Sequence, residues 1–253
     1  MLKKLICGRA MSAAMLTAAC GLCGSALAQP DRNSNTPTGW LWYLNVPNST
    51  IWNAVSDGFR VIDIEESGGT VNAVLVHNSG EYQLFGQALY AGATATAVSN
   101  DLSVNNRRLI DLEPYENSSG ALRFYGTAIP NTGSNAAGWG WLYNTTGNIV
   151  NWVDNNPVPL RLIDIDVYNY NGQRFYSAVA VNNTGNQQQG WWHLYNISSG
   201  ALGTFIEQND ARIVDLEIHQ PQSLFTPATY SAILTPNQNR GWWWYLGMSG
   251  TSL

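Results

Sequence analysis

The residues of this chain that could do chemistry together are an arginine and two acids that recur four times. Residues 60–65 read Arg-Val-Ile-Asp-Ile-Glu, and close variants stand at 108–113, 161–166 and 212–217. Two carboxyl groups about 5–9.5 Å apart could hydrolyse a glycosidic bond. A catalytic residue is normally needed once, however, so four copies in register predict a structural role. The repeated residues are Arg60 and Asp63, Arg108 and Asp111, Arg161 and Asp164, and Arg212 and Asp215.

The spacing of this motif indicates how the repeats are held together. Successive aspartates lie 48, 53 and 51 residues apart, which is typical of tandem units that bury their apolar faces against one another. Side chains alternate along a strand, so Arg60, Ile62 and Ile64 are expected on one side and Asp63 on the other. A carboxylate between aliphatic neighbours needs partners. We therefore expect the aspartates to accept hydrogen bonds from backbone N–H groups or from an arginine of another strand.

Other acids and the histidines give weaker signals. Glu66 and Glu116 stand outside the repeated pattern and could serve a hydrolase, although a solvated charge near a strand end explains them as well. After residues 1–28, the sequence contains no His-x-x-x-His, Cys-x-x-Cys or calcium-loop spacing, no Gly-x-Ser-x-Gly elbow and no phosphate-binding glycine loop. It therefore predicts no metal and no cofactor, and it favours a non-enzymatic protein over a hydrolase.

The eleven tryptophans are the other candidates for recognition chemistry. Together they would bring roughly 2,000 Å² of aromatic surface, far more than a soluble monomer exposes, so most should be core. Trp192 and Trp243 depart from the recurring positions and are expected on the opposite side of their strands. There they could stack on a sugar ring or a peptide, or form a second buried layer. With His193, which replaces a recurring tryptophan, they make up the predicted ligand-binding site.

The elements that must position these residues are predicted to be short strands. An aromatic strand opens each repeat, and a second strand follows a turn, as at Ile51-Trp52 and 149–152. The Arg–Asp strand comes third and a small, apolar strand comes fourth. In the second repeat the aromatic strand fits two registers, starting at Gly80 or at Gly86, and the latter keeps the spacing better. No sustained helical periodicity follows the first 28 residues.

These patterns predict an all-β fold of four antiparallel, four-stranded repeats of about fifty residues, with a fifth aromatic strand closing the chain. The repeats would form a β-propeller-like ring or an open curved β-array, as one domain over residues 39–253. The Arg-[Leu/Ile/Val]-Ile-Asp, Tyr-Ser-Ala-Val and Gly-Trp-Trp phrases resemble the bacterial tandem repeat domain, which is similar to the N-terminal repeat domain of polyglycine hydrolases. That resemblance implies a repeat array without catalytic residues of its own. The Ser-x-x-Lys motif of the hydrolase domain is absent, because no lysine follows Lys4.

Residues 1–28 read as a secretory signal peptide. A basic start is followed by an apolar run, and Ala26-Leu27-Ala28 is a typical cleavage site. Residues 29–38 are polar and are predicted to be a flexible leader. We therefore expect a secreted or periplasmic protein whose mature chain has no cysteine. A lipoprotein anchored through Cys20 is disfavoured, because Thr17 stands where an aliphatic residue is expected.

Charge and hydropathy narrow the expected partners. Without residues 1–28, nine basic and seventeen acidic residues give a net charge of −8, which argues against nucleic acid and anionic membranes. No second apolar stretch is long enough to span a bilayer. We expect a non-catalytic module that binds a glycan or a Gly-rich peptide through its off-pattern aromatic residues. A structural scaffold that binds a protein partner is the alternative.

Overall fold

The computed structural model describes residues 6–7, 39–147, 149–238 and 242–246. The predicted signal peptide (1–28) and leader (29–38) lie outside the described residues, except for strand β1 (Ile6–Cys7). Strands make up 51% and helices 21% of the described residues, so the predicted β-repeat class is confirmed. No helix in this part of the chain is long and apolar enough to cross a membrane.

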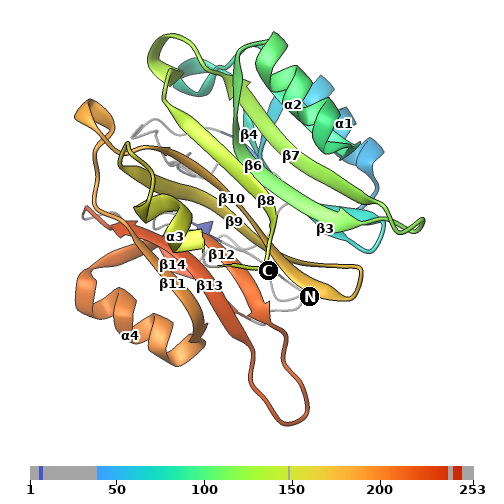
Figure 1. The fold of residues 1–253 in the computed structure, drawn as a ribbon. Helices are drawn as coiled ribbons and strands as arrows, with labels where there is room; N and C mark the ends of the chain where they lie inside the picture. The colour runs from blue at the N-terminus through green and yellow to red at the C-terminus, as the bar shows by residue number, and fades with distance from the viewer. Residues whose placement is uncertain (1–5, 8–38, 148, 239–241, 247–253) are drawn as a thin grey trace, which may run out of the picture. The chain divides into compact units, whose positions relative to one another are not determined.

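Each of the four repeats contains three strands, with one α-helix between the first and the second (Figure 1). The first repeat comprises β2 (Trp40–Val46), α1 (Asn48–Ser56), β3 (Phe59–Ser67) and β4 (Thr70–His77). The second comprises β5 (Ala88–Ala93), α2 (Ala95–Val104), β6 (Arg107–Glu116) and β7 (Leu122–Pro130). The third comprises β8 (Trp139–Thr145), α3 (Ile149–Asp154), β9 (Leu160–Tyr170) and β10 (Gln173–Asn182). The fourth comprises β11 (Trp192–Ser198), α4 (Ser199–Asn209), β12 (Ala211–Gln220) and β13 (Thr229–Pro236), and β14 (Trp243–Trp244) follows it.

The sheet of each repeat is antiparallel and three-stranded, with the last strand of the repeat in the centre, and β1 and β14 form a separate two-stranded sheet. The predicted four-stranded repeat is therefore wrong in one element, because Ile51 and Trp52 lie in α1 and residues 149–152 lie in α3. A strand would alternate its side chains, whereas Ile51 and Ala54 are buried on one face of a helix. In the second repeat, β5 follows the register that starts at Gly86.

Each helix covers one face of its own sheet and builds a core there. In the fourth repeat, Leu202 and Ile206 of α4 pack with apolar residues of β12 and β13 (Figure 1). Two helices begin at a capping side chain, because the hydroxyls of Thr94 and Ser198 accept from backbone N–H groups three residues on, at 3.2 and 3.3 Å. The helices thus follow from local signals and from burial of one apolar stripe.

Each Arg–Asp strand carries a β-bulge at the same place. In β3 the pairing with β4 shifts between Val61 and Asp63, so Ile62 has no partner in that ladder. The same shift occurs in the other three repeats. A bulge inserts one residue and so reverses the alternation of side chains beyond it. The four bulged residues are Ile62, Ile110, Ile163 and Val214.

The bulge decides which side chains of the motif share a face. Val61 and Ile64 both enter the core beneath α1. Arg60, Asp63 and Glu65 consequently lie together on the opposite face of the sheet. The predicted grouping of Arg60 with Ile62 and Ile64 is therefore wrong, because that prediction assumed unbroken alternation.

The motif aspartates of the second and fourth repeats join neighbouring repeats. Asp111 Oδ2 accepts from the backbone N–H of Ile64 at 3.1 Å, and Asp215 Oδ2 accepts from that of Ile165 at 2.7 Å. Both bonds are of the kind that the sequence predicts for the motif. Since both aspartates are buried, each bond satisfies a carboxylate and a strand N–H that water does not reach.

The motif arginines of the first two repeats each bond the turn that follows their repeat. Arg60 Nε donates to the carbonyl oxygen of Tyr82 at 3.0 Å, and Arg108 Nε donates to that of Asn135 at 3.1 Å. Tyr82 and Asn135 are the last residues of short 3-10 turns that follow β4 and β7. The remaining 3-10 turn, Gly185–Gln187, follows β10.

The described chain falls into two compact units that divide after Ala136. We call them the N-terminal pair (repeats one and two, residues 39–136) and the C-terminal pair (repeats three and four, residues 137–246). In the N-terminal pair β3 packs against β6 and β7, and in the C-terminal pair β9 packs against β12 and β13. The same arrangement is thus built twice. One domain over 39–253, as a ring or an open array, stays a prediction.

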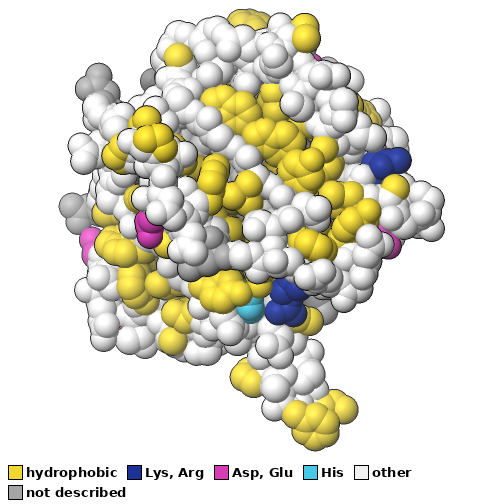
Figure 2. Space-filling view, in the orientation of Figure 1, with side chains coloured by type: hydrophobic (Ala, Val, Ile, Leu, Met, Phe, Trp, Pro, Cys, Tyr) yellow, Lys and Arg dark blue, Asp and Glu magenta, His cyan; other side chains and the backbone are white. Residues whose placement is uncertain are grey.

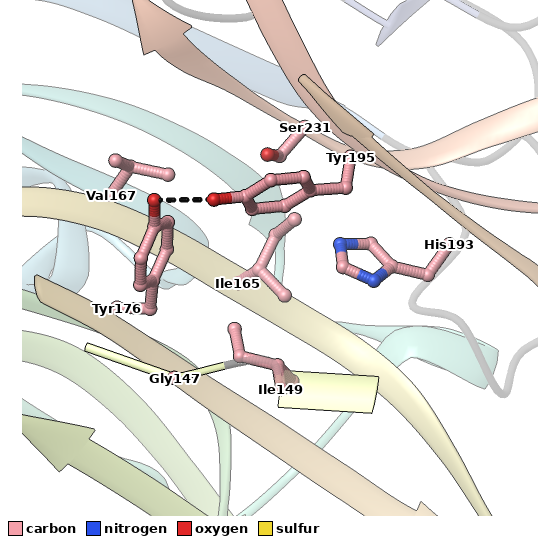
Figure 3. A pocket seen from close by; sticks show the side chains of 8 residues that line it. All are labelled: Gly147, Ile149, Ile165, Val167, Tyr176, His193, Tyr195 and Ser231. Atoms are coloured by element: carbon pink, nitrogen blue, oxygen red, sulfur yellow. Dashed lines mark hydrogen bonds between the residues drawn. The ribbon is translucent and has the colours of Figure 1, made fainter. Parts of the chain in front are cut away.

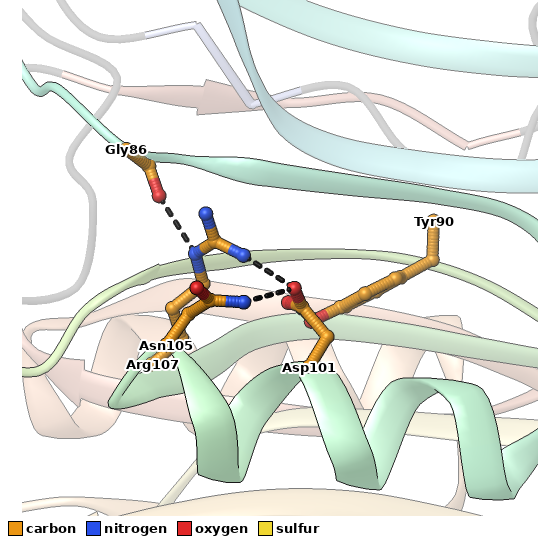
Figure 4. Close-up of polar contacts among 5 residues, drawn as sticks. All are labelled: Gly86, Tyr90, Asp101, Asn105 and Arg107. Atoms are coloured by element: carbon orange, nitrogen blue, oxygen red, sulfur yellow. Dashed lines mark hydrogen bonds and ion pairs between the residues drawn. The ribbon is translucent and has the colours of Figure 1, made fainter.

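A polar cluster fastens α2 to its sheet in the repeat whose first strand lacks tryptophan (Figure 4). Asp101 accepts from the Tyr90 hydroxyl at 2.7 Å and forms an ion pair with Arg107 at 2.5 Å. Arg107 Nε also donates to the Gly86 carbonyl at 2.8 Å. Burial alone would raise the pKa of Asp101, but the hydrogen bonds from Arg107 and Tyr90 outweigh it and lower that pKa.

The fourth repeat has an extended hairpin. Residues 221–228 join β12 to β13, whereas two residues join the corresponding strands of the first and third repeats. At its tip Leu224 and Phe225 are 95% and 92% exposed, and Figure 2 shows apolar atoms at the end of this projection. Ser223 Oγ accepts from the Phe225 N–H at 3.2 Å, so the tip is an ordered turn. We call Leu224 and Phe225 the apolar tip.

Candidate ligand-binding hollow

A hollow lies within the C-terminal pair, between the third and the fourth repeat (Figure 3). The enclosed part of the hollow measures about 10 Å³, which is room for about one water molecule, and the rest of its space is open to solvent. It is lined by Gly147, Ile149, Ile165, Val167, Tyr176, His193, Tyr195 and Ser231.

The N-terminal pair holds a tyrosine at the equivalent place. Ser231 pairs with Glu217 in its sheet as Tyr125 pairs with Glu113, so the two residues hold the same position in their repeats. Tyr125 is buried in the core of the first repeat, whereas Ser231 faces the hollow. A serine in place of a phenol ring leaves room at this position.

The partner of that tyrosine is also replaced. The Tyr125 hydroxyl accepts from Asn48 Nδ2 at 2.9 Å. Asn45 and Asn144 both have left-handed backbone and mark the same place in the first and third repeats. Asn48 follows the first of them by three residues and Gly147 follows the second by three, so Gly147 occupies the position of Asn48. Gly147 lines the hollow. The space thus arises where the C-terminal pair lacks both the ring and the amide that bonds it.

Two phenols form a polar wall of the hollow, and the imidazole of His219, which is not one of the lining residues, packs against both. The hydroxyls of Tyr176 and Tyr195 lie 2.8 Å apart and share a hydrogen bond (Figure 3). The His219 ring stands edge-on to Tyr195 at 4.5 Å and parallel to Tyr176 at 5.9 Å. Burial raises the pKa of Tyr176 to about 12, and the bond to Tyr195 adds to this shift, so the Tyr176 phenol stays protonated at neutral pH. Tyr195 is 55% exposed and forms the mouth.

His193 points into the hollow without a hydrogen bond. Neither of its ring nitrogens has a partner among the described residues. Burial lowers the pKa of His193 to about 4, so its ring is neutral near pH 7. In the N-terminal pair the same register position belongs to Leu89, which packs against the core of the first repeat. An apolar residue therefore suits this position, and the packing does not explain the imidazole.

The three predicted ligand-binding residues lie in different surroundings. Trp192 packs against the core beneath α4 and meets the Phe205 ring edge-on at 5.7 Å, so packing accounts for it. The side chain of Trp243 lies outside the described residues. Of His193 and Trp192, only His193 lines the hollow. Trp192 faces α4, so His193, the next residue of the strand, faces the other way.

The acids that could serve a hydrolase lie elsewhere. Glu66 Oε1 accepts from the Gly69 N–H at 2.7 Å and so closes the hairpin between β3 and β4. Glu116 is exposed at the end of β6. No acid lines the hollow, and no group of three or more His, Cys, Asp or Glu side chains is gathered for a metal within the described ranges. The arrangement can bind and orient a neutral group.

Sequence reasoning missed Tyr176, Tyr195 and Ser231. Their signal is a difference between repeats, because Tyr176 stands where the first repeat has Val71 and Ser231 where the second has Tyr125. Equivalent positions in different repeats can be aligned only when the strand registers are known, and the bulges shift those registers. No protein-family model matches the chain, and no curated protein matches it.

Proposed function

We propose that this protein is an exported, non-catalytic module that binds a glycan at the hollow. Export is supported by the signal-peptide pattern of residues 1–28. Glycan binding is supported by the half-exposed ring of Tyr195, which offers an apolar face to a sugar, beside hydroxyls and an imidazole that can pair with its polar groups.

One observation carries this proposal: the C-terminal pair has a hollow, lined by His193 and two tyrosines, at the position where the N-terminal pair buries Tyr125. A buried imidazole without partners costs stability, and the chain itself shows an apolar alternative in Leu89. A binding site explains why the less stable arrangement occurs in only one of two otherwise similar units.

The test is a titration of the mature chain with oligosaccharides, in which tryptophan fluorescence or calorimetry measures binding. We expect saturable binding that Ser231→Tyr abolishes, because a phenol at this position would fill the hollow as Tyr125 fills its equivalent. Tyr195→Ala should weaken binding. Tyr143→Ala is the matched control, since Tyr143 also precedes a left-handed asparagine on its strand and is exposed.

Two results would contradict the proposal. One is the absence of saturable binding to any oligosaccharide while thermal unfolding shows an intact fold. The other is binding that Ser231→Tyr leaves unchanged, because the ligand would then bind elsewhere. Ser231→Tyr must unfold at a temperature equal to or above that of the unaltered chain for the comparison to count.

A protein-interaction scaffold is the second candidate, and the apolar tip favours it. Two apolar side chains exposed above 90% on an ordered turn are unusual for a surface that contacts only water. Cross-linking and recovery from the source cell should then yield a stoichiometric partner that Leu224→Ser/Phe225→Ser loses. A chain that keeps the same partner after this change would refute a role of the tip.

A further inference from the structure

We propose that the apolar tip inserts into the surface of a zwitterionic lipid layer. The tip consists of Leu224 and Phe225, at the apex of the extended hairpin of the fourth repeat, and the two side chains are 95% and 92% exposed. This inference does not depend on ligand binding at the hollow. A lipid surface and a protein partner are the two kinds of occupant to compare, and three features of the hairpin favour lipid.

The first feature is how far the tip stands out from its sheet. Gln220 and Thr229 form the last pair of the β12–β13 ladder, so residues 221–228 lie beyond the sheet. At about 3.3 Å per extended residue, the tip reaches up to roughly 13 Å past that pair. Peripheral segments bury their apolar groups about 5–10 Å deep in a lipid surface. The tip can therefore enter lipid before the sheet meets the headgroups.

The shape of the tip supports the same occupant. Figure 2 shows the hairpin as a narrow projection with apolar atoms at its end. A rigid protein partner would need a pocket that matches this projection, whereas lipid chains can close around it.

The second feature is that the turn bonds its own polar groups. The Ser223 N–H donates to the Thr226 carbonyl oxygen at 2.9 Å, and Ser223 Oγ accepts from the N–H groups of Phe225 and Thr226 at 3.2 and 3.0 Å. Pro221 and Pro227, on either side of the turn, have no N–H. Backbone polar groups find no partner in hydrocarbon, so internal bonds lower the cost of entering lipid. A protein partner could supply such bonds itself.

The third feature is the distribution of charge. Residues 218–236, which include the hairpin loop and β13, contain no aspartate, glutamate, lysine or arginine. No charged side chain of this segment would therefore lose its hydration as the tip enters lipid. The chain without residues 1–28 carries a net charge of −8, so anionic lipid would repel the molecule as a whole. Together these charges favour a zwitterionic surface.

The experiment measures binding of the mature chain to phosphatidylcholine vesicles by co-sedimentation at millimolar lipid. A single myristoyl chain binds with a constant of about 10⁴ M⁻¹, and we expect two side chains to bind no more tightly. Leu224→Ser/Phe225→Ser should lower the binding constant at least about tenfold, because each apolar side chain favours transfer out of water.

The matched control removes two exposed apolar side chains outside the tip. Phe85 and Val104 are 75% and 82% exposed and belong to the N-terminal pair. Phe85→Ser/Val104→Ser should therefore bind vesicles as the unaltered chain does.

A second measurement reports where the tip lies. The sequence has no cysteine after residue 28, so Leu224→Cys can carry a single environment-sensitive fluorophore. Its emission should shift to shorter wavelength when phosphatidylcholine vesicles are added. The same fluorophore at Ser118→Cys, in the exposed turn between β6 and β7, should show no shift. Vesicles that also contain phosphatidylglycerol should bind the chain more weakly, because their charge repels it.

Four results would overturn the inference. One is the absence of binding to phosphatidylcholine, and another is an equal loss of binding in the tip variant and in its control. A third is tighter binding to the vesicles that contain phosphatidylglycerol. The fourth is a protein partner, or a second copy of the chain, that Leu224→Ser/Phe225→Ser releases while vesicles bind neither chain, because a protein would then cover the tip.

Discussion

His193 and Leu89 stand at equivalent positions of the two repeat pairs, so each is a reference for the other. The leucine contributes to a core, and the histidine lines the hollow. The same comparison holds for Ser231 and Tyr125. At the scale of single residues, the site is thus defined by a few exchanges of apolar bulk for polar groups.

The neutral state of His193 predicts how stability depends on pH. Its pKa is about 4 in the folded chain, against about 6.5 when unfolded. The folded state therefore binds fewer protons in this range, and stability that is present above pH 6.5 is lost as the pH falls towards 4, by up to about 3 kcal/mol. His193→Leu should flatten this loss, as measured by urea unfolding at pH 7 and pH 4.5. Equal pH dependence of both chains would contradict the buried, neutral imidazole.

Tyr125→Ser should create in the N-terminal pair the space that the C-terminal pair has by nature. Because the ring is buried and its hydroxyl bonds Asn48, the free energy of unfolding should fall by about 3–5 kcal/mol. Tyr125→Phe is the control and should cost about 1 kcal/mol, since it removes only the hydrogen bond. Denaturant unfolding measures both. A loss no larger than that of the control would mean that the ring contributes little packing.

At the scale of elements, the bulge of each Arg–Asp strand directs the motif. It turns Asp111 and Asp215 towards the strand of the preceding repeat, where they accept backbone N–H bonds. Without the extra residue, regular alternation would send each aspartate to the opposite face. The bulge therefore places the aspartate where it can bond the neighbouring repeat.

Asp111→Ala should lower the free energy of unfolding by about 1–3 kcal/mol, because the Ile64 N–H loses a buried acceptor. Asp111→Asn keeps a carbonyl oxygen and should cost less. Asp215→Ala should behave alike, because Asp215 makes the same bond in the C-terminal pair. Hydrogen exchange of the Ile64 amide provides the direct measurement, and unchanged protection in Asp111→Ala would refute the assigned bond.

The sequence predicts the repeats, the strand class and the structural role of the motif, because these signals recur four times. It does not predict the helices. The segments that form α1 and α3 are short and contain β-branched residues and tryptophan, which are typical of strands. Stronger signals are present in α2 and α4, where Thr94 and Ser198 precede apolar residues spaced by four. The residues of the hollow cannot be predicted from the sequence, because the bulges change which residues of neighbouring strands lie opposite each other.

At the scale of the whole molecule, the same pair of repeats is built twice, and the C-terminal pair contains the hollow. The extended hairpin of the fourth repeat adds a second difference between the pairs. Replacing residues 221–228 by Asn-Gly, the turn that joins β9 to β10, should leave the fold and glycan binding intact, because long and short surface loops differ little in closure entropy. Thermal unfolding and the oligosaccharide titration measure both, and a loss of binding would place the hairpin in the site.

The apolar tip also governs how the protein meets solid surfaces. Leu224 and Phe225 sit on a turn without a charged neighbour from Gln220 to Ala228, so little hydration opposes their contact with an apolar material. On polystyrene or an alkyl-coated sensor chip, these two side chains, the most exposed large apolar ones in the described ranges, should favour attachment through the tip. Layers of the unaltered chain should then be more uniformly oriented than layers of the Asn-Gly variant.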